Sequence, residues 1–293
     1  MSFRQNVSLK FYLVKVLIFK ILRISHIYRL DNFKMILPAE HMLPFYRSKY
    51  SRYDKFLPFL AKYFEDGDLI IDVGANIGDT FIQMFLVNNK LNFICIEPDP
   101  RFFKYLSINI KRLERISNMI SVQPIQKLVG TQTDNAHLIG KGGTKHAILA
   151  NVPSSLGSYC LLDSLLSDTN KKRVKLLKID TDGYDWDVLN SSKEIILQSH
   201  PLIYFEIFAE NVSVYKNYCD SIAFLSLQGY KDYFVFDNFG GFIAKLNLEG
   251  LDSLMKYVLK QNEGIATRTI HYFDVLTCLK VNSTLIEEIL DKY

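Results

Sequence analysis

The stretch that decides the fold is LIIDVGANIGDT, which runs from Leu69 to Thr80. Its apolar start predicts a buried strand, and Asp72 closes that strand. Gly74 and Gly78 then permit a tight turn and a close approach of the backbone to a ligand. The polar residues after Gly78 suit the first turn of a helix whose apolar positions lie at 81–86. A strand, a glycine loop and a helix N-terminus together predict a cradle for a nucleotide or cofactor, because N–H groups and the helix dipole favour a negative group there.

The spacing of the two glycines separates this loop from the dinucleotide-binding fingerprint. That fingerprint is G-x-G-x-x-G, whereas three residues lie between Gly74 and Gly78. An ordinary strand-to-helix turn is the alternative, but such turns often carry a single glycine. Two glycines, a strand-end Asp and an Asn within seven residues favour a ligand site. The spacing and the wording DVGANIG resemble the first motif of class I S-adenosylmethionine (SAM) methyltransferases, and the FkbM family in particular.

A second acidic strand end supports a nucleotide-like ligand. The predicted strand Phe93–Ile96 is followed directly by Glu97, Pro98 and Asp99. A carboxylate at the end of the second strand can accept hydrogen bonds from both hydroxyls of a ribose. This arrangement suits either SAM or NAD, and an exposed loop acid is the alternative. The exit of the third predicted strand, 120–130, often frames the adenine in this fold.

The second strong motif is LLKIDTDGYDWDVL, residues 176–189. It resembles the FkbM segment L-K-I-D-x-E-G-x-E-x-x-V-L, with Asp182 where the family usually has Glu. Asp180 and Asp182 follow a predicted fourth strand, and ligands bind at the carboxyl ends of strands in open α/β sheets. A structural turn is the alternative for these two acids. Asp185 and Asp187 suit the N-terminus of a helix, where the dipole favours acids.

The order of elements predicts an α/β fold with a doubly wound, mostly parallel, seven-stranded sheet. A terminal antiparallel hairpin, typical of class I methyltransferases, is expected from two strands around the turn at 237–241. The remaining expected elements are a helix at 101–113, a short helix at Leu161–Leu166 capped by Asp163, a fifth strand at Pro201–Glu206, helices at Val212–Gln228 and 249–262, hairpin strands at Tyr230–Phe236 and Phe242–Leu246, a strand or substrate-side element at Tyr272–Leu279, and a helix at Asn282–Tyr293.

The chain is expected to divide into an N-terminal helical extension, 1–64, and a methyltransferase domain, 65–293. Residues 1–60 carry 11 basic and 3 acidic side chains, a balance of 11 − 3 = +8. Apolar residues predict helices at Phe11–Ile24 and Ser48–Phe64. The first helix either packs on the domain or a second subunit, lies on an anionic membrane, or is a disordered arm. Because helices before the first strand can cover a methyltransferase pocket, His41 and Tyr46 are weaker site candidates.

Composition excludes several classes of function. The net charge of +4 over 293 residues is too mild to indicate nucleic-acid binding. The four cysteines are scattered without a C-x-x-C pair, which indicates buried thiols in a reducing compartment. Lys15 and Lys20 interrupt the apolar N-terminal run, so we predict no transmembrane helix. A cytoplasmic protein is expected, with contact to the inner face of a membrane and homodimer formation as open alternatives.

The resemblance implies a SAM-dependent O-methyltransferase acting on a hydroxyl of a sugar or glycan, such as a nucleotide sugar or a surface glycan. An NAD-linked oxidoreductase and a non-catalytic SAM-fold partner of a glycan assembly complex remain alternatives. The predicted cofactor site comprises Asp72, Gly74, Ala75, Asn76, Gly78, Asp79, Glu97, Pro98 and Asp99.

Methyl transfer to a hydroxyl needs a device that removes the proton of the hydroxyl. Asp180 or Asp182 could act as a general base. Alternatively, Asp180, Asp182 and Glu206, all at predicted strand ends, could hold Mg²⁺ through oxygen ligands and lower the pKa of the hydroxyl. A structural alternative is that Asp182 only shapes the turn and Asp180 only orients the methionine ammonium of SAM.

Overall fold

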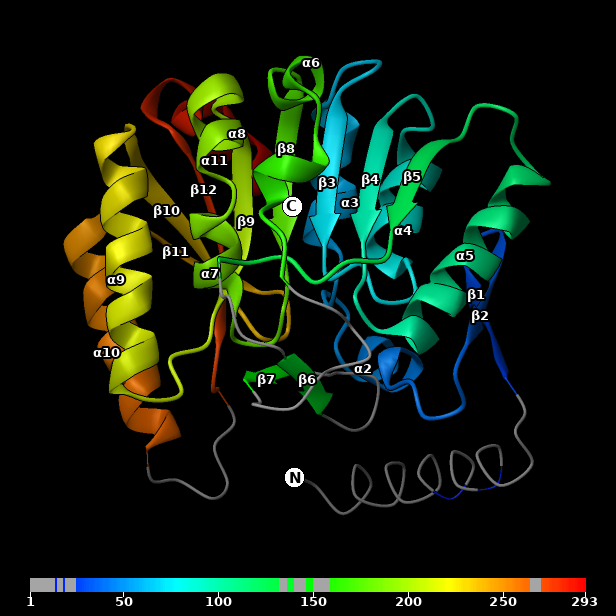
Figure 1. Cartoon of the computed structure of the whole chain (residues 1–293), viewed down its shortest axis with the longest axis horizontal. Coiled ribbons are helices and arrows are strands. Elements are labelled where there is room, and N and C mark those ends of the chain that lie inside the picture. Colours follow the sequence, from blue (N-terminus) through cyan, green and yellow to red (C-terminus); the bar gives the residue numbers. More distant parts are fainter. Residues whose placement is uncertain are drawn as a thin grey trace.

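The structure is a computed structural model that describes residues 25–131, 159–263 and 270–293, with Val14, Ile18 and the backbone of the strands β6 (Ala136–Ile139) and β7 (His146–Leu149). One large twisted sheet runs through the molecule, with helices on both of its faces (Figure 1). Two short hairpins, β6–β7 and an N-terminal one, form separate two-stranded sheets. In the described ranges, none of the helices has the length and apolarity needed to cross a bilayer.

The large sheet contains eight described strands. Their spatial order is β11 (Phe242–Leu246), β10 (Tyr230–Asp237), β12 (Phe273–Leu279), β9 (Leu202–Ile207), β8 (Val174–Ile179), β3 (Leu69–Val73), β4 (Asn92–Ile96) and β5 (Ser121–Ile125). The five strands from β9 to β5 are parallel, and β12 is antiparallel to both β9 and β10. The predicted α/β class with a mostly parallel sheet is confirmed.

The predicted strand count and the end of the sheet need correction. The hairpin strands β10 and β11 do pair antiparallel, as expected. The strand at the C-terminal end of the chain, β12, inserts between β9 and β10, so the hairpin lies at the sheet edge and the described strands number eight rather than seven. Sequence alternation identifies a strand, but only tertiary pairing decides its neighbours.

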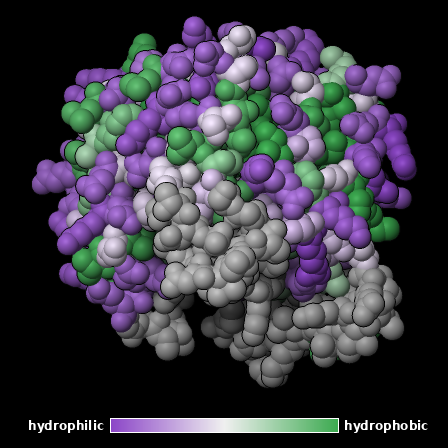
Figure 2. All heavy atoms as spheres, viewed as in Figure 1, coloured by the Kyte–Doolittle hydropathy of each residue, from purple (hydrophilic) through white to green (hydrophobic). Residues whose placement is uncertain are grey.

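Helices cover both faces because the central strands are buried on both sides. Ile70 contributes to one apolar cluster and Ile71 to the other, as a period of two requires. The first face carries α3 (Phe56–Leu60), α4 (Asp79–Val87), α5 (Pro100–Glu114) and α11 (Lys280–Lys292). The second face carries α7 (Asp185–Asn190), α8 (Lys193–Ser199), α9 (Val212–Leu227), α10 (Leu248–Asn262) and the 3₁₀ turn η2 (Leu162–Leu165). The outer surface mixes hydrophilic with scattered apolar residues (Figure 2).

The N-terminal extension is not the purely helical segment that the sequence predicts. It contains a hairpin of β1 (His26–Leu30) and β2 (Phe33–Leu37), which the sequence analysis missed. Asn109 of α5 docks this hairpin, because its side chain accepts from Ile36 N at 2.8 Å and donates to Ile36 O at 3.0 Å. The helix predicted at Phe11–Ile24 falls outside the described residues, apart from Val14 and Ile18, which are helical.

The single helix predicted at Ser48–Phe64 is wrong. The segment contains the end of α2 (Leu43–Lys49), a loop at 50–55, α3 and the 3₁₀ turn η1 (Ala61–Tyr63). The loop is held by tertiary contacts, because a Cβ on Gly240 would lie 2.2 Å from Arg52 O, and Tyr293 Oη donates to that oxygen at 3.3 Å. Asp54 has φ +53°, which no continuous helix contains.

The capping prediction for Asp163 is also wrong, since the short segment there is a 3₁₀ turn. The Asp163 carboxylate instead accepts hydrogen bonds from Glu194 N at 2.9 Å and Ile195 N at 3.0 Å, at the start of α8. The acid therefore caps a helix 30 residues further along the chain, after α6 (Asp168–Lys171) and β8. The third strand is also shorter than expected, because β5 ends at Ile125.

Candidate active site

The glycine loop between β3 and α4 forms the tight turn that the sequence predicts. Gly74 has φ +77°, and a Cβ there would lie 1.8 Å from Asp180 O. The loop therefore crosses directly over the end of β8, with room only for glycine. Gly74 N and Ala75 N both donate to Ile96 O, at 2.9 and 3.0 Å. These bonds bring the ends of β3, β4 and β8 together at one edge of the sheet.

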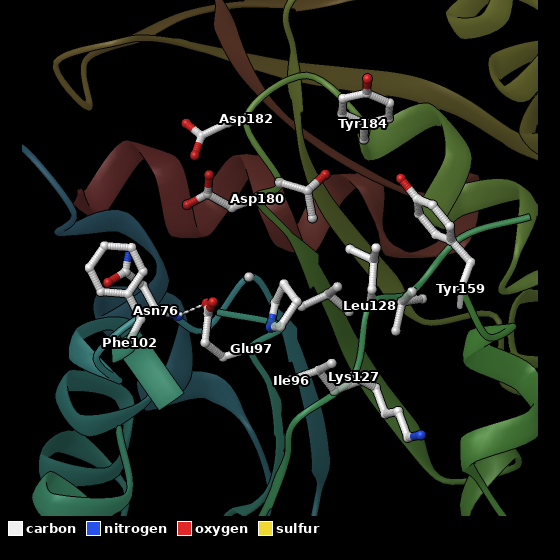
Figure 3. A pocket seen from close by; sticks show the side chains of 15 residues that line it. Asn76, Ile96, Glu97, Phe102, Lys127, Leu128, Tyr159, Asp180, Asp182 and Tyr184 are labelled. Atoms are coloured by element: carbon white, nitrogen blue, oxygen red, sulfur yellow. Dashed lines mark hydrogen bonds between the residues drawn. The ribbon is translucent and has the colours of Figure 1, made fainter. Parts of the chain in front are cut away.

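Glu97 lies at the end of β4 and is held by the same loop. It is 5% exposed, and its Oε2 accepts from Asn76 N at 2.8 Å (Figure 3). Its Oε1 accepts from Asp99 N at 2.8 Å. Burial raises the pKa of Glu97 to about 8, while these two N–H groups oppose the rise. Each carboxylate oxygen keeps one further lone-pair direction for a ligand hydroxyl.

Beneath the loop lies a buried lysine that the sequence analysis did not select. Lys178 of β8 is 3% exposed, and its Nζ lies 2.8 Å from Asp72 Oδ1, 3.4 Å from Asp180 Oδ2 and 3.2 Å from Gly74 O. Burial disfavours its charge, but Asp72 and Asp180 outweigh burial and raise its pKa. Its signal in the sequence is a Lys that stands directly between Leu177 and Ile179 in the central strand β8.

The pairing with Lys178 changes the role expected for Asp72. Asp72 is completely buried and faces the lysine, and burial raises its pKa while Lys178 lowers it. Asp72 thus supports the loop from below. Asp99 likewise supports the site from outside, because its Oδ1 accepts from Arg101 N and Phe102 N and caps α5.

A pocket of about 620 Å³, including the part open to solvent, lies over this edge of the sheet. Six sequence-predicted residues line it, namely Gly74, Asn76, Glu97, Pro98, Asp180 and Asp182. The other five predicted cofactor residues, Asp72, Ala75, Gly78, Asp79 and Asp99, belong to the supporting loop and helix starts and are not among the lining residues.

Most of the opposite wall of the pocket comes from residues outside the two motifs, and only Tyr184 belongs to the second motif. Lys127 and Leu128 follow β5, and Tyr159 and Tyr184 add aromatic rings (Figure 3). Only the exit of the third strand could be anticipated, from its place in the fold. Tyr159 arrives after a long connection, and tertiary folding alone places it here.

Asp180 and Asp182 both line the open side of the pocket (Figure 3). The Asp180 side chain is 53% exposed, and Asp182 adopts φ +52°. The nearby acids have structural roles instead. Asp185 is fully buried and accepts from Thr181 N at 2.8 Å and from Glu206 N at 2.7 Å, which ties the β8–α7 turn to β9.

The residues proposed for Mg²⁺ do not form a metal site. Glu206 lies at the end of β9, and it is absent from the pocket that Asp180 and Asp182 line. Across the described ranges, no group of three or more His, Cys, Asp or Glu side chains is arranged to hold a metal ion. Activation of the hydroxyl by Mg²⁺ bound to Asp180, Asp182 and Glu206 is therefore not supported.

His41 joins the N-terminal extension to the glycine loop. Its Nδ1 accepts from Leu43 N at 3.3 Å, so Nε2 carries the proton and faces Asn76 Oδ1 at 3.4 Å. Burial lowers the pKa of His41 to about 4, against the effect of Asn76 and Glu40. A neutral imidazole thus contacts a lining residue of the pocket.

Comparison with known proteins identifies the family. The methyltransferase FkbM domain matches residues 72–231, which are 160 of the 293 residues. The chain belongs to the FkbM methyltransferase family. The match spans the glycine loop, Glu97 and the Asp180–Asp182 turn, so the resemblance noted in the sequence is confirmed. No curated protein matches the chain significantly.

Several solved structures are similar to this methyltransferase. An FkbM methyltransferase from Methylobacillus flagellatus is 20% identical over 56% of this chain and 40% of its own, with a TM-score of 0.38. TYW2 from M. jannaschii in complex with AdoMet is 12% identical, covering 87% of this chain and 84% of its own, with a TM-score of 0.45. The plantazolicin methyltransferase BpumL in complex with SAH is 10% identical, covering 82% and 89%, with a TM-score of 0.42. The chain thus spans less than half the length of the first.

Proposed function

We propose that this FkbM methyltransferase uses SAM and transfers its methyl group to a hydroxyl of a sugar or glycan. The observation that carries the cofactor assignment is the Glu97 carboxylate. It is buried, held by two backbone N–H groups at 2.8 Å each, and lies in the wall of the pocket beside the glycine loop. A carboxylate in this place suits the two hydroxyls of a ribose.

The residues present fit SAM as a whole. Glu97 would hold the ribose hydroxyls, and the apolar side chains of Ile96 and Leu128 would contact the adenine. The close crossing of Gly74 over Asp180 O leaves backbone, not side chains, next to the methionine part. When bound, SAM supplies an electrophilic methyl group on a sulfonium.

The two acids Asp180 and Asp182 are assigned different roles in the site. Asp180 is tied through Lys178 to the loop, so we assign it to positioning the cofactor end of the site. Asp182 is assigned to proton removal. Asp182 would accept the proton of the acceptor hydroxyl, while bound SAM would supply the methyl group and leave as S-adenosylhomocysteine.

Calorimetry with S-adenosylhomocysteine (SAH) tests the cofactor site. Glu97→Ala should weaken SAH binding by about 1.5–3 kcal/mol, as expected for a lost hydrogen bond to a charged group. Gly74→Val should abolish binding, because a side chain there collides with Asp180 O. Glu249→Ala, an exposed acid of α10, is the matched control and should bind like wild type.

Two outcomes would contradict this assignment. Unchanged SAH affinity in both variants would show that the cofactor site lies elsewhere. Binding of NAD in preference to SAH would favour the oxidoreductase alternative. For the transfer itself, the readout is SAH release from SAM in the presence of a sugar acceptor.

A further inference from the structure

The N-terminal extension supports both of the N–H groups that hold the Glu97 carboxylate. Asn76 N donates to Glu97 Oε2, and Asp99 N donates to Oε1, each at 2.8 Å. Two adjacent residues of the extension, Glu40 and His41, contact the segments that carry these donors. The FkbM domain match begins at residue 72, so both contacts come from outside the matched region.

The first contact joins His41 to the side chain of Asn76. Asn76 has φ +49°, in the left-handed region that residues other than glycine enter at a cost. His41 Nε2 carries the proton and faces Asn76 Oδ1 at 3.4 Å, while Nδ1 accepts from Leu43 N at 3.3 Å. The imidazole thus links the extension to the Asn76 side chain. This contact favours the backbone conformation that directs the Asn76 N–H at Glu97.

The imidazole itself is held firmly in place. His41 is 8% exposed, and His41 N donates to Pro38 O at 3.1 Å. Its ring meets the ring of Phe102 edge-on, with the centroids 6.4 Å apart and the planes at 82°. Phe102 lines the pocket, as Asn76 does (Figure 3). A packed and hydrogen-bonded side chain has little freedom, so it can fix the loop that it contacts.

The second contact reaches the other donor. Glu40 forms an ion pair with Arg101 in the first turn of α5. Asp99 Oδ1 accepts from Arg101 N at 2.9 Å, so this helix start also carries the Asp99 N–H that holds Glu97. The Arg101 side chain is 48% exposed, and an ion pair with such an exposed partner contributes little by itself. We therefore assign the larger effect to His41.

Asn109 of α5 ties the extension to the same loop. Its Nδ2 donates to Ile36 O of β2 at 3.0 Å and to Ile77 O at 2.9 Å. Ile77 directly follows Asn76 in the glycine loop. The hairpin, α5 and the glycine loop are therefore connected by hydrogen bonds, and His41 approaches the loop from an extension that is already docked.

We propose that His41 is a positioning residue for the cofactor site, because through Asn76 it holds the N–H group that orients the Glu97 carboxylate toward the ribose hydroxyls. The proposal rests on the proposed function, since it takes Glu97 as the ligand of the ribose. His41 is not among the residues that line the pocket, so it acts through Asn76. Recognition of the ribose thus depends on a residue outside the matched methyltransferase domain.

The test measures how well the protein distinguishes a ribose from a deoxyribose. SAH and its 2′-deoxy analogue are titrated into the full-length protein by calorimetry. The wild type should prefer SAH about tenfold or more, because the analogue lacks a hydrogen bond to a charged group. His41→Phe keeps a ring against Phe102 but has no N–H, and should reduce the preference to about threefold or less. His41→Gln supplies an N–H toward Asn76 and should restore the preference.

Two further variants separate positioning from a general loss of structure. Asn76→Gly removes the side chain that His41 contacts, and glycine accepts the positive φ, so the preference should fall as in His41→Phe. The double variant should show no further fall, because both changes break the same contact. His26→Phe, the same change at the first residue of β1, is the matched control and should keep the full preference.

An unchanged preference in His41→Phe or in Asn76→Gly would overturn the proposal, even with weaker binding of both ligands, because His41 would then have a purely structural role. If His41→Phe does not fold, Asn76→Gly decides. The full preference in Glu97→Ala would reject the proposal together with the ribose assignment of Glu97. Failure of the wild-type protein to bind SAH would reject the proposed function itself.

Discussion

Lys178 shows how a single buried side chain can hold a cofactor loop. Its Nζ contacts Asp72 at 2.8 Å, Gly74 O at 3.2 Å and Asp180 at 3.4 Å, so it links three strand ends. Lys178→Met keeps the length of the side chain but leaves Asp72 buried and unpaired. We expect a loss of about 3–5 kcal/mol in the free energy of unfolding, measured by urea denaturation.

Two further variants make the Lys178 test specific. Lys175→Met replaces an exposed lysine of the same strand and should change stability by less than about 0.5 kcal/mol. The double variant with Asp72→Asn should recover part of the loss, because the buried charge has gone. A Lys178→Met protein as stable as wild type would show that the ion pair contributes nothing.

At the same scale, Asp182 carries the prediction about chemistry. Asp182→Asn keeps the shape of the side chain and removes its charge. SAH binding should stay near normal, while kcat falls by at least about 10²-fold, as expected when a general base is lost. Asp168→Asn, an exposed acid of α6, should retain full turnover. Full turnover in Asp182→Asn would exclude this residue as the base.

His41 predicts a dependence of stability on pH. Burial lowers its pKa from 6.5 to about 4, so the unfolded chain takes up a proton before the folded protein does. The stabilising contribution is therefore complete above about pH 6.5 and is lost as the pH falls toward 4. The full shift corresponds to about 3 kcal/mol. His41→Gln should flatten this part of the stability–pH curve, and an unchanged curve would contradict the assignment.

At the scale of elements, the loop at 50–55 packs directly against the β10–β11 turn. Gly240 has φ +84°, and a Cβ there would meet Arg52 O at 2.2 Å. Gly240→Ala should displace the loop and lower the free energy of unfolding by about 1–3 kcal/mol, measured by urea denaturation, because the added Cβ is both crowded and in a strained backbone conformation. Gly250→Ala in α10, where the closest atoms are side-chain atoms at 3.3 Å, is the control. A Gly240→Ala protein as stable as wild type would show that the loop can move without cost.

At the scale of the whole molecule, charge is divided unevenly along the chain. Residues 1–60 carry +8, and the remainder therefore carries 4 − 8 = −4. From the sequence we propose that the first 24 residues, which are basic and apolar, bind an anionic membrane surface. Each basic residue near such a surface contributes about 1 kcal/mol, and salt weakens the attraction.

Liposome co-sedimentation tests this arm. The full chain should pellet with vesicles that contain anionic lipid, less so at high salt, and not with neutral vesicles. A chain beginning at Ser25 keeps the β1–β2 hairpin and should remain in the supernatant. Equal pelleting of the two chains, or none with anionic vesicles, would favour a packing or dimerisation role for the arm.

Local sequence by itself determined the central strands, the glycine turn and the acids at the strand ends. Leu69–Ile71, Gly74 and Glu97 could be assigned because burial, positive φ and position after a strand each have a local signature. Only the tertiary structure decided that β12 inserts between β9 and β10, that Asp72 faces Lys178, and that Glu206 faces Asp274. Those pairings join residues far apart in the chain, and the packing energy that selects them depends on neighbours that no local pattern encodes.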